Sequence, residues 1–398
     1  MHLNRLSLIM ALGGLFTAWL PQPGTAQEQF GSSPAQYVPY RDGQKWGFAN
    51  SEKKVVISLD YEETNPFIEE MARVKIGKKY GFINTKSEQV VAIKYYYASD
   101  FEKGLARVLL NGRYGLINAQ GQEITPIKYE EISFFSEGMA RVKQNGKYGF
   151  INEKGEEVIR LAYDNASDFQ DGVVAVKSGY YWGHIDTQNQ VVTEPKYEFA
   201  LEFHQGLAAV KDKGRWGFIN RQGQLVVPHK YLAVESFYEG WARVEYEGRW
   251  GFIDTSGREI APKYDAAISF REGLAAVSFG ERWGFIDRAG NTVIPFKYSR
   301  AGSFYDGIAK VQMGELWGFI DREGREIVPP RYERIGSFQE GLVPVQLNGK
   351  WGFLNRSGQI VIPARYDSVY GFEQGIAKVY LGSTAGYIDA NGNEFFKN

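Results

Sequence analysis

The stretch Met139-Ala-Arg-Val-Lys-Gln-Asn-Gly-Lys-Tyr-Gly-Phe-Ile-Asn152 decides the fold of this 398-residue chain. Two segments of alternating apolar and polar residues flank Asn145-Gly146, and both residues of that pair tolerate the positive φ of a type I′ turn. A two-residue turn predicts a β-hairpin and fixes its register. The predicted cross-strand pairs are Ala140 with Ile151 and Val142 with Gly149 on one face, and Arg141 with Phe150 and Lys143 with Tyr148 on the other.

The aromatic-Gly pair of this hairpin recurs with a period of 34 residues, for example from Tyr114 to Tyr148, and once with a step of 33, from Trp250 to Trp283. Such a period indicates a tandem-repeat architecture. The glycines of the pairs, which we expect to be structural, are Gly47, Gly81, Gly115, Gly149, Gly183, Gly217, Gly251, Gly284, Gly318, Gly352 and Gly386. We expect each to leave room for the opposing Val and for a neighbouring layer.

Two further aromatic positions repeat in phase. The tyrosines are Tyr61, Tyr95, Tyr129, Tyr163, Tyr197, Tyr231, Tyr264, Tyr298, Tyr332 and Tyr366. The phenylalanines are Phe67, Phe101, Phe135, Phe169, Phe203, Phe237, Phe270, Phe304, Phe338 and Phe372. We interpret the rings mainly as apolar filling between neighbouring units. Cations at the position of Arg141, namely Arg73, Arg107, Arg243, Lys310 and Lys378, favour cation–π contacts with rings on the same face.

Turn residues complete each unit. Gly280-Glu281 and Gly314-Glu315 fit type II′ hairpin turns. An Asn or Asp followed three residues later by Gly, as at Asn152 and Gly155, then predicts a turn into a third antiparallel strand. That strand is of the type Gln359-Ile-Val-Ile-Pro363, and its Pro marks the edge of a sheet.

Three segments, Lys350-Trp-Gly-Phe-Leu-Asn355, Val361-Ile-Pro-Ala-Arg-Tyr-Asp367 and Phe338-Gln-Glu-Gly-Leu342, resemble the WG (KWG) repeat family. The resemblance covers residues 37–398. It implies a bacterial β-repeat protein, often exported, for which the family establishes no general activity and carries over no catalytic residue. Tyr replaces Trp in units two to four, and Ala385 lacks a ring, which suggests a capping last unit.

We expect an all-β fold with about ten units of 34 residues and three strands each, arranged as an open, superhelical, solenoid-like array. The alternative is one or two closed β-propellers. Propeller blades usually have four strands in about 40–45 residues. Three strands in 34 residues disfavour closure, unless the segment between the Tyr and Phe positions adds a short fourth strand.

The first 26 residues differ from the rest. A basic start is followed by an apolar run from Leu6 to Leu20 and by the small residues Gly24-Thr25-Ala26. This pattern predicts a signal peptide at 1–26, cleaved after Ala26, or alternatively an uncleaved anchor. Residues 27–36 are predicted to be a flexible lead-in, and 37–398 the repeat array. We therefore expect an exported protein, periplasmic or secreted, with no membrane span in the mature chain.

Composition excludes several classes of protein. The 46 Lys and Arg against 47 Asp and Glu give a net charge of −1, with both signs interspersed, so we expect no nucleic-acid partner. The chain has no Cys, which excludes a disulfide framework, and stability must come from packing.

Catalytic and metal-binding patterns are weak. His184, His204 and His229 fall in different units, and no ligand-spacing motif surrounds them, so we expect no metal site and no cofactor. A calcium ladder on the Asx turns is the alternative that we disfavour, because turn chemistry accounts for those residues. Acids follow the Tyr position and precede the Gly of the next turn in most units. This regular supply indicates a solvated, salt-paired edge rather than one asymmetric catalytic pair.

Binding residues are expected where the repeat breaks its own pattern. Tyr180-Tyr181 crowd a hairpin next to Trp182, and His184 takes a Phe position. Trp241 replaces the usual Leu, and the register places it on the face of Arg243, Trp250 and Phe252. Drift between repeats is the alternative explanation. The ligand-contact candidates are Tyr180, Tyr181, Trp182, His184, Trp241, Arg243 and Trp250.

From these observations we expect a non-catalytic binding or scaffold protein of the cell envelope or extracellular space. Its partner would be a protein or an envelope polymer that contacts the repetitive surface. One alternative is glycan binding through exposed Trp and Tyr rings. A second alternative is a hydrolase whose site lies on loops at one end of the array.

Overall fold

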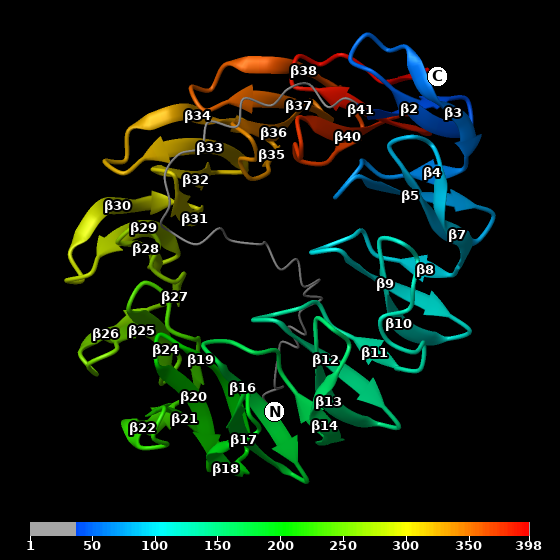
Figure 1. The fold of residues 1–398 in the computed structure, drawn as a ribbon. Helices are drawn as coiled ribbons and strands as arrows, with labels where there is room; N and C mark the ends of the chain where they lie inside the picture. The colour runs from blue at the N-terminus through cyan, green and yellow to red at the C-terminus, as the bar shows by residue number, and fades with distance from the viewer. Residues whose placement is uncertain (1–36, 398) are drawn as a thin grey trace, which may run out of the picture. The chain divides into compact units, whose positions relative to one another are not determined.

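The computed structural model describes residues 37–397, which belong to one compact unit of β-strands and turns. These residues form eleven β-sheets, nine with four strands and two with three (Figure 1). Within a sheet, neighbouring strands follow each other along the chain, except where the last strand joins the first sheet. The predicted signal peptide and lead-in lie outside the described residues.

We number the sheets in chain order. Sheet 1 contains β42 (Phe396–Lys397), β1 (Val38–Asp42), β2 (Lys45–Ala49) and β3 (Val55–Tyr61). Sheet 2 contains β4 (Glu63–Thr64), β5 (Met71–Ile76), β6 (Lys79–Asn84) and β7 (Gln89–Tyr95). Sheet 3 contains β8 (Tyr97–Ala98), β9 (Leu105–Leu110) and β10 (Arg113–Asn118). Sheet 4 contains β11 (Glu131–Ile132), β12 (Met139–Gln144), β13 (Lys147–Asn152) and β14 (Glu157–Tyr163). Sheet 5 contains β15 (Asn165–Ala166), β16 (Val173–Ser178), β17 (Tyr181–Asp186) and β18 (Val191–Tyr197). Sheet 6 contains β19 (Phe199–His204), β20 (Leu207–Asp212), β21 (Arg215–Asn220) and β22 (Leu225–Tyr231).

Sheet 7 contains β23 (Ala233–Val234), β24 (Trp241–Tyr246), β25 (Arg249–Asp254) and β26 (Glu259–Tyr264). Sheet 8 contains β27 (Ala266–Ala267), β28 (Leu274–Phe279), β29 (Arg282–Asp287) and β30 (Thr292–Tyr298). Sheet 9 contains β31 (Arg300–Tyr305), β32 (Ile308–Met313), β33 (Leu316–Asp321) and β34 (Glu326–Tyr332). Sheet 10 contains β35 (Arg334–Ile335), β36 (Leu342–Leu347), β37 (Lys350–Asn355) and β38 (Ile360–Tyr366). Sheet 11 contains β39 (Ser368–Val369), β40 (Ile376–Leu381) and β41 (Thr384–Asp389).

The predicted hairpin is confirmed in sheet 4, where β12 pairs with β13 in the predicted register, Val142 opposite Gly149 and Arg141 opposite Phe150. Asn145 and Gly146 both have positive φ, 52° and 75°, as a type I′ turn requires. The prediction of type II′ at Gly280-Glu281 is wrong, because φ is positive at both residues (59° and 65°).

The remaining turn predictions are also confirmed. At Gly314-Glu315 only the glycine has a positive φ (61°), which fits type II′. Asn152 Oδ1 accepts hydrogen bonds from the backbone N–H groups of Lys154 and Glu156, both at 3.0 Å, as an Asx turn does. The Pro-containing strand, such as β38, lies at the edge of its sheet, as predicted.

The recurring glycine serves a different purpose from the one predicted. Between β13 and β14 the register shifts by a bulge, so that Tyr148 pairs with Tyr163 and Phe150 with Ile159. A Cβ on Gly149 would lie 2.5 Å from the carbonyl oxygen of Ile159, in the fourth strand of the same sheet. All eleven glycines of the aromatic-Gly pairs would place a Cβ closer than 3.0 Å to another atom. In most sheets the glycine therefore makes room for the edge strand of its own sheet rather than for an opposing Val. Gly386 is the exception, since a Cβ there would meet the Phe396 side chain of sheet 1.

The Phe positions hold adjacent sheets together. The Phe150 ring meets the Phe169 ring of the next sheet at 4.9 Å and 70°, an edge-to-face contact. Equivalent contacts join Phe48 to Phe67, Phe82 to Phe101, Phe218 to Phe237, Phe252 to Phe270, Phe285 to Phe304, Phe319 to Phe338 and Phe353 to Phe372. This packing confirms the interpretation of the rings as filling between units.

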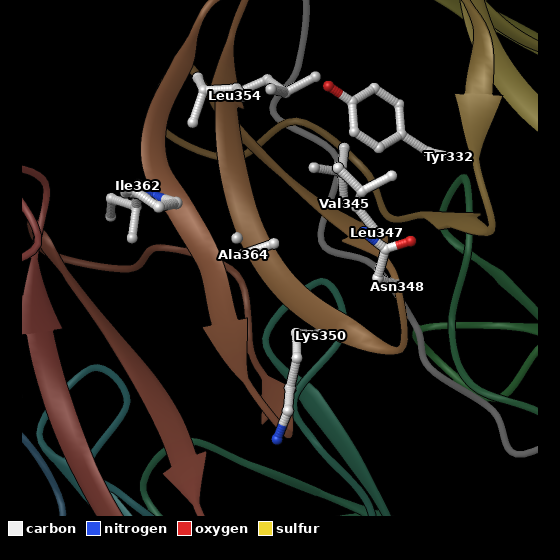
Figure 2. Close-up of a pocket in the computed structure, with 11 residues that line it drawn as sticks. Tyr332, Val345, Leu347, Asn348, Lys350, Leu354, Ile362 and Ala364 are labelled. Atoms are coloured by element: carbon white, nitrogen blue, oxygen red, sulfur yellow. The ribbon is translucent and has the colours of Figure 1, made fainter.

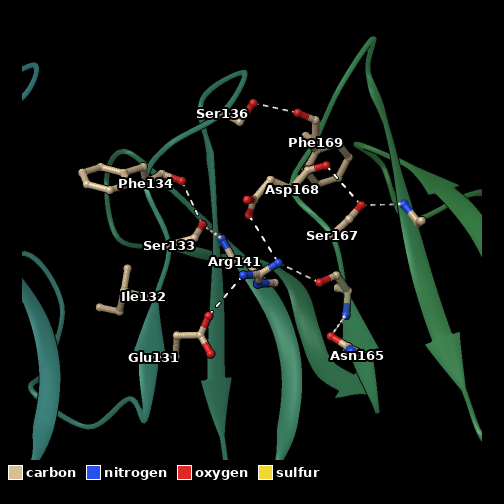
Figure 3. Close-up of polar contacts among 12 residues, drawn as sticks. Glu131, Ile132, Ser133, Phe134, Ser136, Arg141, Asn165, Ser167, Asp168 and Phe169 are labelled. Carbon is tan, nitrogen blue, oxygen red and sulfur yellow. Dashed lines mark hydrogen bonds and ion pairs between the residues drawn. The ribbon is translucent and has the colours of Figure 1, made fainter. Parts of the chain in front are cut away.

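Arg141 forms a polar link between sheets 4 and 5 (Figure 3). Its guanidinium donates to the carbonyl oxygen of Ala166 in the next sheet (2.7 Å) and to Glu131 (3.1 Å), and Asp168 lies 3.6 Å away. The predicted cation–π contacts at this position are confirmed for Arg73 over Tyr80, Arg141 over Tyr148, Arg243 over Trp250 and Lys310 over Trp317. The same arginines thus stack on a ring and bridge two sheets.

The last strand closes the array on the first sheet. β42 pairs in parallel with β1, Phe396 opposite Arg41 and Lys397 opposite Asp42. The backbone N–H of Arg41 donates to the carbonyl oxygen of Phe395 (3.2 Å). An apolar cluster that includes Val38, Tyr40, Tyr387 and Phe395 fills this junction.

The expectation of an open, solenoid-like array is therefore wrong, and the ring is closed. Eleven buried apolar clusters occur, each between consecutive sheets, and one of them joins sheet 11 to sheet 1. The segment between the Tyr and Phe positions supplies an additional strand, at the opposite edge of the sheet from the Pro-containing strand. This additional strand is only two residues long in most sheets. In sheets 9 and 10 this strand, β31 or β35, lies toward the middle of the ring, and β34 or β38 lies at the rim (Figure 1). Each of the eleven sheets contains one of the recurring glycines, from Gly47 in β2 to Gly386 in β41, and β42 adds a fourth strand to sheet 1.

In six sheets a Glu or Gln in the turn before the second strand links its sheet to the next. The Glu340 carboxylate accepts hydrogen bonds from the backbone N–H groups of Gln374 (2.7 Å) and Gly375 (2.8 Å). Glu69, Glu137, Gln205, Glu239 and Glu272 make equivalent bonds. Among the described residues, the shorter Asp171 and Asp306 make none. These acids are carboxylate staples between sheets, and not merely a solvated edge.

We expect Glu340→Asp and Glu340→Ala each to lower the free energy of unfolding by about 1 kcal/mol, because both lose the two bonds to a neighbouring backbone. Glu340→Gln should cost about half as much, since an amide has one acceptor oxygen and the Gln205 side chain makes one such bond, at 2.7 Å. Urea unfolding of the three variants measures the difference. Equal stability of the Asp and Gln variants would show that the staple contributes nothing.

Candidate functional site

The predicted candidates at the sheet 5 hairpin fall into exposed and buried residues. Tyr180 lies in the turn between β16 and β17 and is 88% exposed, and Tyr181 is 50% exposed. Gly179 has φ 63°, which allows the tight turn that pushes Tyr180 outward. Their role in ligand contact stays a prediction.

Trp182 is buried, with an exposed fraction of 7%, and its ring contacts Phe199 of sheet 6 at 5.1 Å. Phe199 in turn lies 5.9 Å from Trp216. Phe199 is 41% exposed, and the sequence reasoning missed it. This position holds Tyr97, Glu131 or Asn165 in preceding units and has no regular pattern that would have singled out Phe199. The three rings form a row that crosses from sheet 5 to sheet 6.

His184 is fully buried and links two sheets. Its Nε2 lies 2.9 Å from the carbonyl oxygen of Leu201 in sheet 6, and its Nδ1 lies 2.8 Å from the hydroxyl of Thr193. Because a carbonyl oxygen only accepts, Nε2 carries the proton and Nδ1 accepts from Thr193. The ring packs edge-on against Phe203 at 4.9 Å. Burial lowers the pKa of His184 to about 4, so the ring is neutral at pH 7. His184 therefore replaces a core Phe and is not available at the surface.

The predicted group around Trp241 lies in sheet 7. Trp241 is buried and contacts Phe270 of sheet 8 at 5.4 Å, as Phe252 does at 4.8 Å, so the predicted shared face is confirmed. Arg243 lies over the Trp250 ring at 4.3 Å and also hydrogen-bonds to Ala267 of sheet 8. These three side chains hold sheets 7 and 8 together. No contact between them and the sheet 5 hairpin is found in the described part of the chain.

The periodic acids that follow the Tyr position bind hairpin turns. Asp164 pairs with Lys147 of the preceding sheet (2.5 Å) and accepts from the backbone N–H of Gly179 (2.7 Å). The hydrogen bond from Lys147 lowers the pKa of Asp164, and Lys350 does the same for Asp367. A lowered pKa keeps these groups ionised as acceptors, which suits a structural cap rather than a general acid.

Metal ligands do not gather in the structure: within residues 37–397, no three His, Asp or Glu side chains come close enough to hold a metal ion. None of the described residues forms a helix long and apolar enough to span a membrane.

Eleven sheets arranged around a closed ring define a β-propeller, and residues 37–397 form a propeller of eleven blades. Its repeats match the model of the WG containing repeat in ten consecutive segments, 46–80, 80–114, 114–148, 148–182, 182–216, 216–250, 250–283, 283–317, 317–351 and 351–383. The chain belongs to the WG repeat family. Each matched segment starts in the middle of one sheet and ends in the next, so the sequence repeat straddles two blades.

The solved structures that match the chain share little sequence with it. A eukaryotic initiation factor has 11% identity and a TM-score of 0.44, over 71% of this chain and 92% of that one. PorZ, a surface component of the type-IX secretion system of Porphyromonas gingivalis, has 9% identity and a TM-score of 0.27, over 90% and 60%. Hsv2p of Kluyveromyces lactis has 14% identity and a TM-score of 0.32, over 56% and 92%. No curated protein matches the chain in sequence.

Proposed function

We propose that the protein is an exported, non-catalytic binding protein of the cell envelope or extracellular space, with a protein or an envelope polymer as its partner. The observation that carries the proposal is the exposure of three large rings on sheets 5 and 6, those of Tyr180, Tyr181 and Phe199. Large aromatic side chains supply much contact energy at little conformational cost, and they are enriched at binding surfaces. Export rests on the basic start, the apolar run and Gly24-Thr25-Ala26.

Absence of catalysis is part of the proposal. The regular acids are engaged with backbone N–H groups of turns, and His184 is enclosed between two sheets. These groups are therefore committed to structure rather than to proton transfer. We expect no hydrolysis of envelope polymers by the purified protein.

A retention experiment tests the binding role. Purified protein is immobilised and offered peptidoglycan sacculi and, separately, detergent-solubilised envelope proteins. We expect one of the two to be retained, and Tyr180→Ser/Tyr181→Ser/Phe199→Ser to reduce retention by about tenfold, the loss of one or more contact residues. Phe279→Ser/Tyr305→Ser, which removes exposed rings from sheets 8 and 9, is the matched control and should retain normally. The proposal fails if neither probe binds, or if both variants behave alike.

Glycan recognition is the second candidate function. The exposed rings of Tyr181 and Phe199 favour it, because sugar faces stack on aromatic rings, whereas Trp182 is buried and offers no free face. In the same experiment, retention of sacculi after protease treatment supports a glycan ligand, whereas retention of solubilised proteins alone counts against it.

A further inference from the structure

A cavity of about 240 Å³ lies between sheets 9 and 10 (Figure 2). Tyr332 of sheet 9 borders it, and Val345, Leu347, Leu354 and Ile362 of sheet 10 supply apolar walls. Ala364 forms another part of the wall. The cavity is therefore an apolar recess at a junction between two blades.

The cavity exists because one repeat position is filled by the smallest side chain. The residue two before the Tyr of the edge strand is Ala364 here. In the other units it is Leu59, Ile93, Ile127, Leu161, Pro195, His229, Pro262, Phe296 or Pro330. In sheet 2, Ile93 covers Gly81, so close that a Cβ there would lie 2.8 Å from the Ile93 side chain. Ala364 has a much smaller side chain, and it lines the cavity together with Gly352.

Sheet 8 shows what this space can hold. Phe296, at the position of Ala364, packs against the apolar cluster between sheets 7 and 8, which contains Tyr264. Its ring lies 6.0 Å from Phe279, the counterpart of Leu347 in the cavity wall. The junction geometry of this ring therefore accepts a phenyl group in the space that Ala364 leaves empty.

A polar atom also borders the cavity. The Tyr366 hydroxyl donates to Glu394 (3.1 Å), and Tyr231 donates in the same way to Glu259. Ile360 stands at the position of these glutamates, since it pairs with Leu354 as Glu259 pairs with Ile253. Tyr332 is 1% exposed and borders the cavity, so its hydroxyl is placed to hydrogen-bond to a ligand bound there.

We propose that this cavity is a binding site for a small, uncharged monocyclic phenol. The ring occupies the space filled by Phe296 in sheet 8, and the ligand hydroxyl hydrogen-bonds to the hydroxyl of Tyr332. The volume is below the range of about 300–1,000 Å³ typical of larger ligands, which fits a single ring. Lys350 at the edge is already paired with Asp367 (2.5 Å), so the site does not select an anion.

Titration calorimetry of the whole protein with p-cresol tests the proposal, with toluene as the ligand that lacks the hydroxyl. We expect saturable binding of p-cresol at one site. Ala364→Phe and Ala364→Ile, which introduce the side chains present at positions 296 and 93, should weaken it by about tenfold or more because they fill the space. Both variants should keep or raise the melting temperature, since the cavity is filled.

A second variant isolates the hydroxyl. Tyr332→Phe should weaken p-cresol binding by about three- to tenfold, the loss of one hydrogen bond, and leave toluene binding within about twofold. Binding of p-cresol to Ala364→Phe with the wild-type affinity, or no saturable binding to the wild type, overturns the proposal. Equal loss of both ligands in Tyr332→Phe overturns the assignment of the hydroxyl contact. The site is independent of the ring surface on sheets 5 and 6, so either proposal can fail alone.

Discussion

Replacing Phe395 with alanine is expected to lower the free energy of unfolding by about 3–5 kcal/mol, the cost of removing a buried phenyl group from a packed core. Phe395 is 2% exposed and fills the junction of sheets 11 and 1 with Val38, Tyr40 and Tyr387. The backbone bond from Arg41 to the Phe395 carbonyl is kept in the variant, so the loss reports the side chain. Chemical denaturation measures the change.

The matched control is Phe304→Ala, at the junction of sheets 8 and 9 inside the repeat array, where the ring is also fully buried. In a closed ring the two substitutions remove equivalent packing and should cost the same within about 1 kcal/mol. Lys397→Ala removes only an exposed ion pair with Asp42 and should change stability by less than about 0.5 kcal/mol. A loss near zero for Phe395→Ala, beside a full loss for Phe304→Ala, would mean that the junction of the chain ends is open in solution.

Local structure was predictable because its determinants are near one another in the sequence. Asn145-Gly146 sets the turn and hence the register of β12 and β13, which the structure confirms. The period of the Phe positions similarly predicts packing between neighbours, as Phe150 and Phe169 show. The Phe position and the glycine of the aromatic-Gly pair recur with the same period, so the pattern stands out from single substitutions.

Closure was not predictable by the same reasoning. A two-residue strand such as β35 is too short to show an alternating pattern, so three strands per unit were expected where most sheets have four. The strand pairs that close the ring, such as Arg41 with Phe396, join the two ends of the array. They occur only once, so a periodic pattern in the sequence cannot predict them. The carboxylate staples were not predicted for a related reason. Glu340 bonds to backbone groups of another sheet, and since every residue has a backbone, the sequence does not show which backbone groups are bound.

The candidate site was predicted in part. Tyr180-Tyr181 break the repeat within a turn, and turns face solvent, so their exposure follows from the sequence. Whether Trp241 and His184 are exposed depends on the neighbouring sheet, and both prove to be covered by a Phe of the next sheet, Phe270 or Phe203. The cavity beside Ala364 likewise depends on two sheets at once and could not be located from one unit alone.

The free energy of unfolding is expected to depend strongly on pH because of His184. Burial lowers its pKa in the folded protein to about 4, against 6.5 in an exposed chain. Between these two values the unfolded chain binds more protons than the folded one, so the free energy of unfolding falls as the pH falls. We expect the His184 contribution to stability to decrease by about 2 kcal/mol from pH 7 to pH 5, and by about 3 kcal/mol at pH 4.

His184→Phe isolates this contribution, because Phe occupies the position in most other sheets and keeps an edge-on contact with Phe203. Thr193 and the Leu201 carbonyl lose a partner in the variant, so at pH 7 it should be the less stable protein by about 1–3 kcal/mol. Carboxylates with lowered pKa, such as Asp164, weaken both proteins alike as the pH falls through their range. The stability difference between the two proteins should therefore shrink by about 2 kcal/mol from pH 7 to pH 5. A difference that stays constant over this interval would show that the folded protein admits a charged imidazole between sheets 5 and 6.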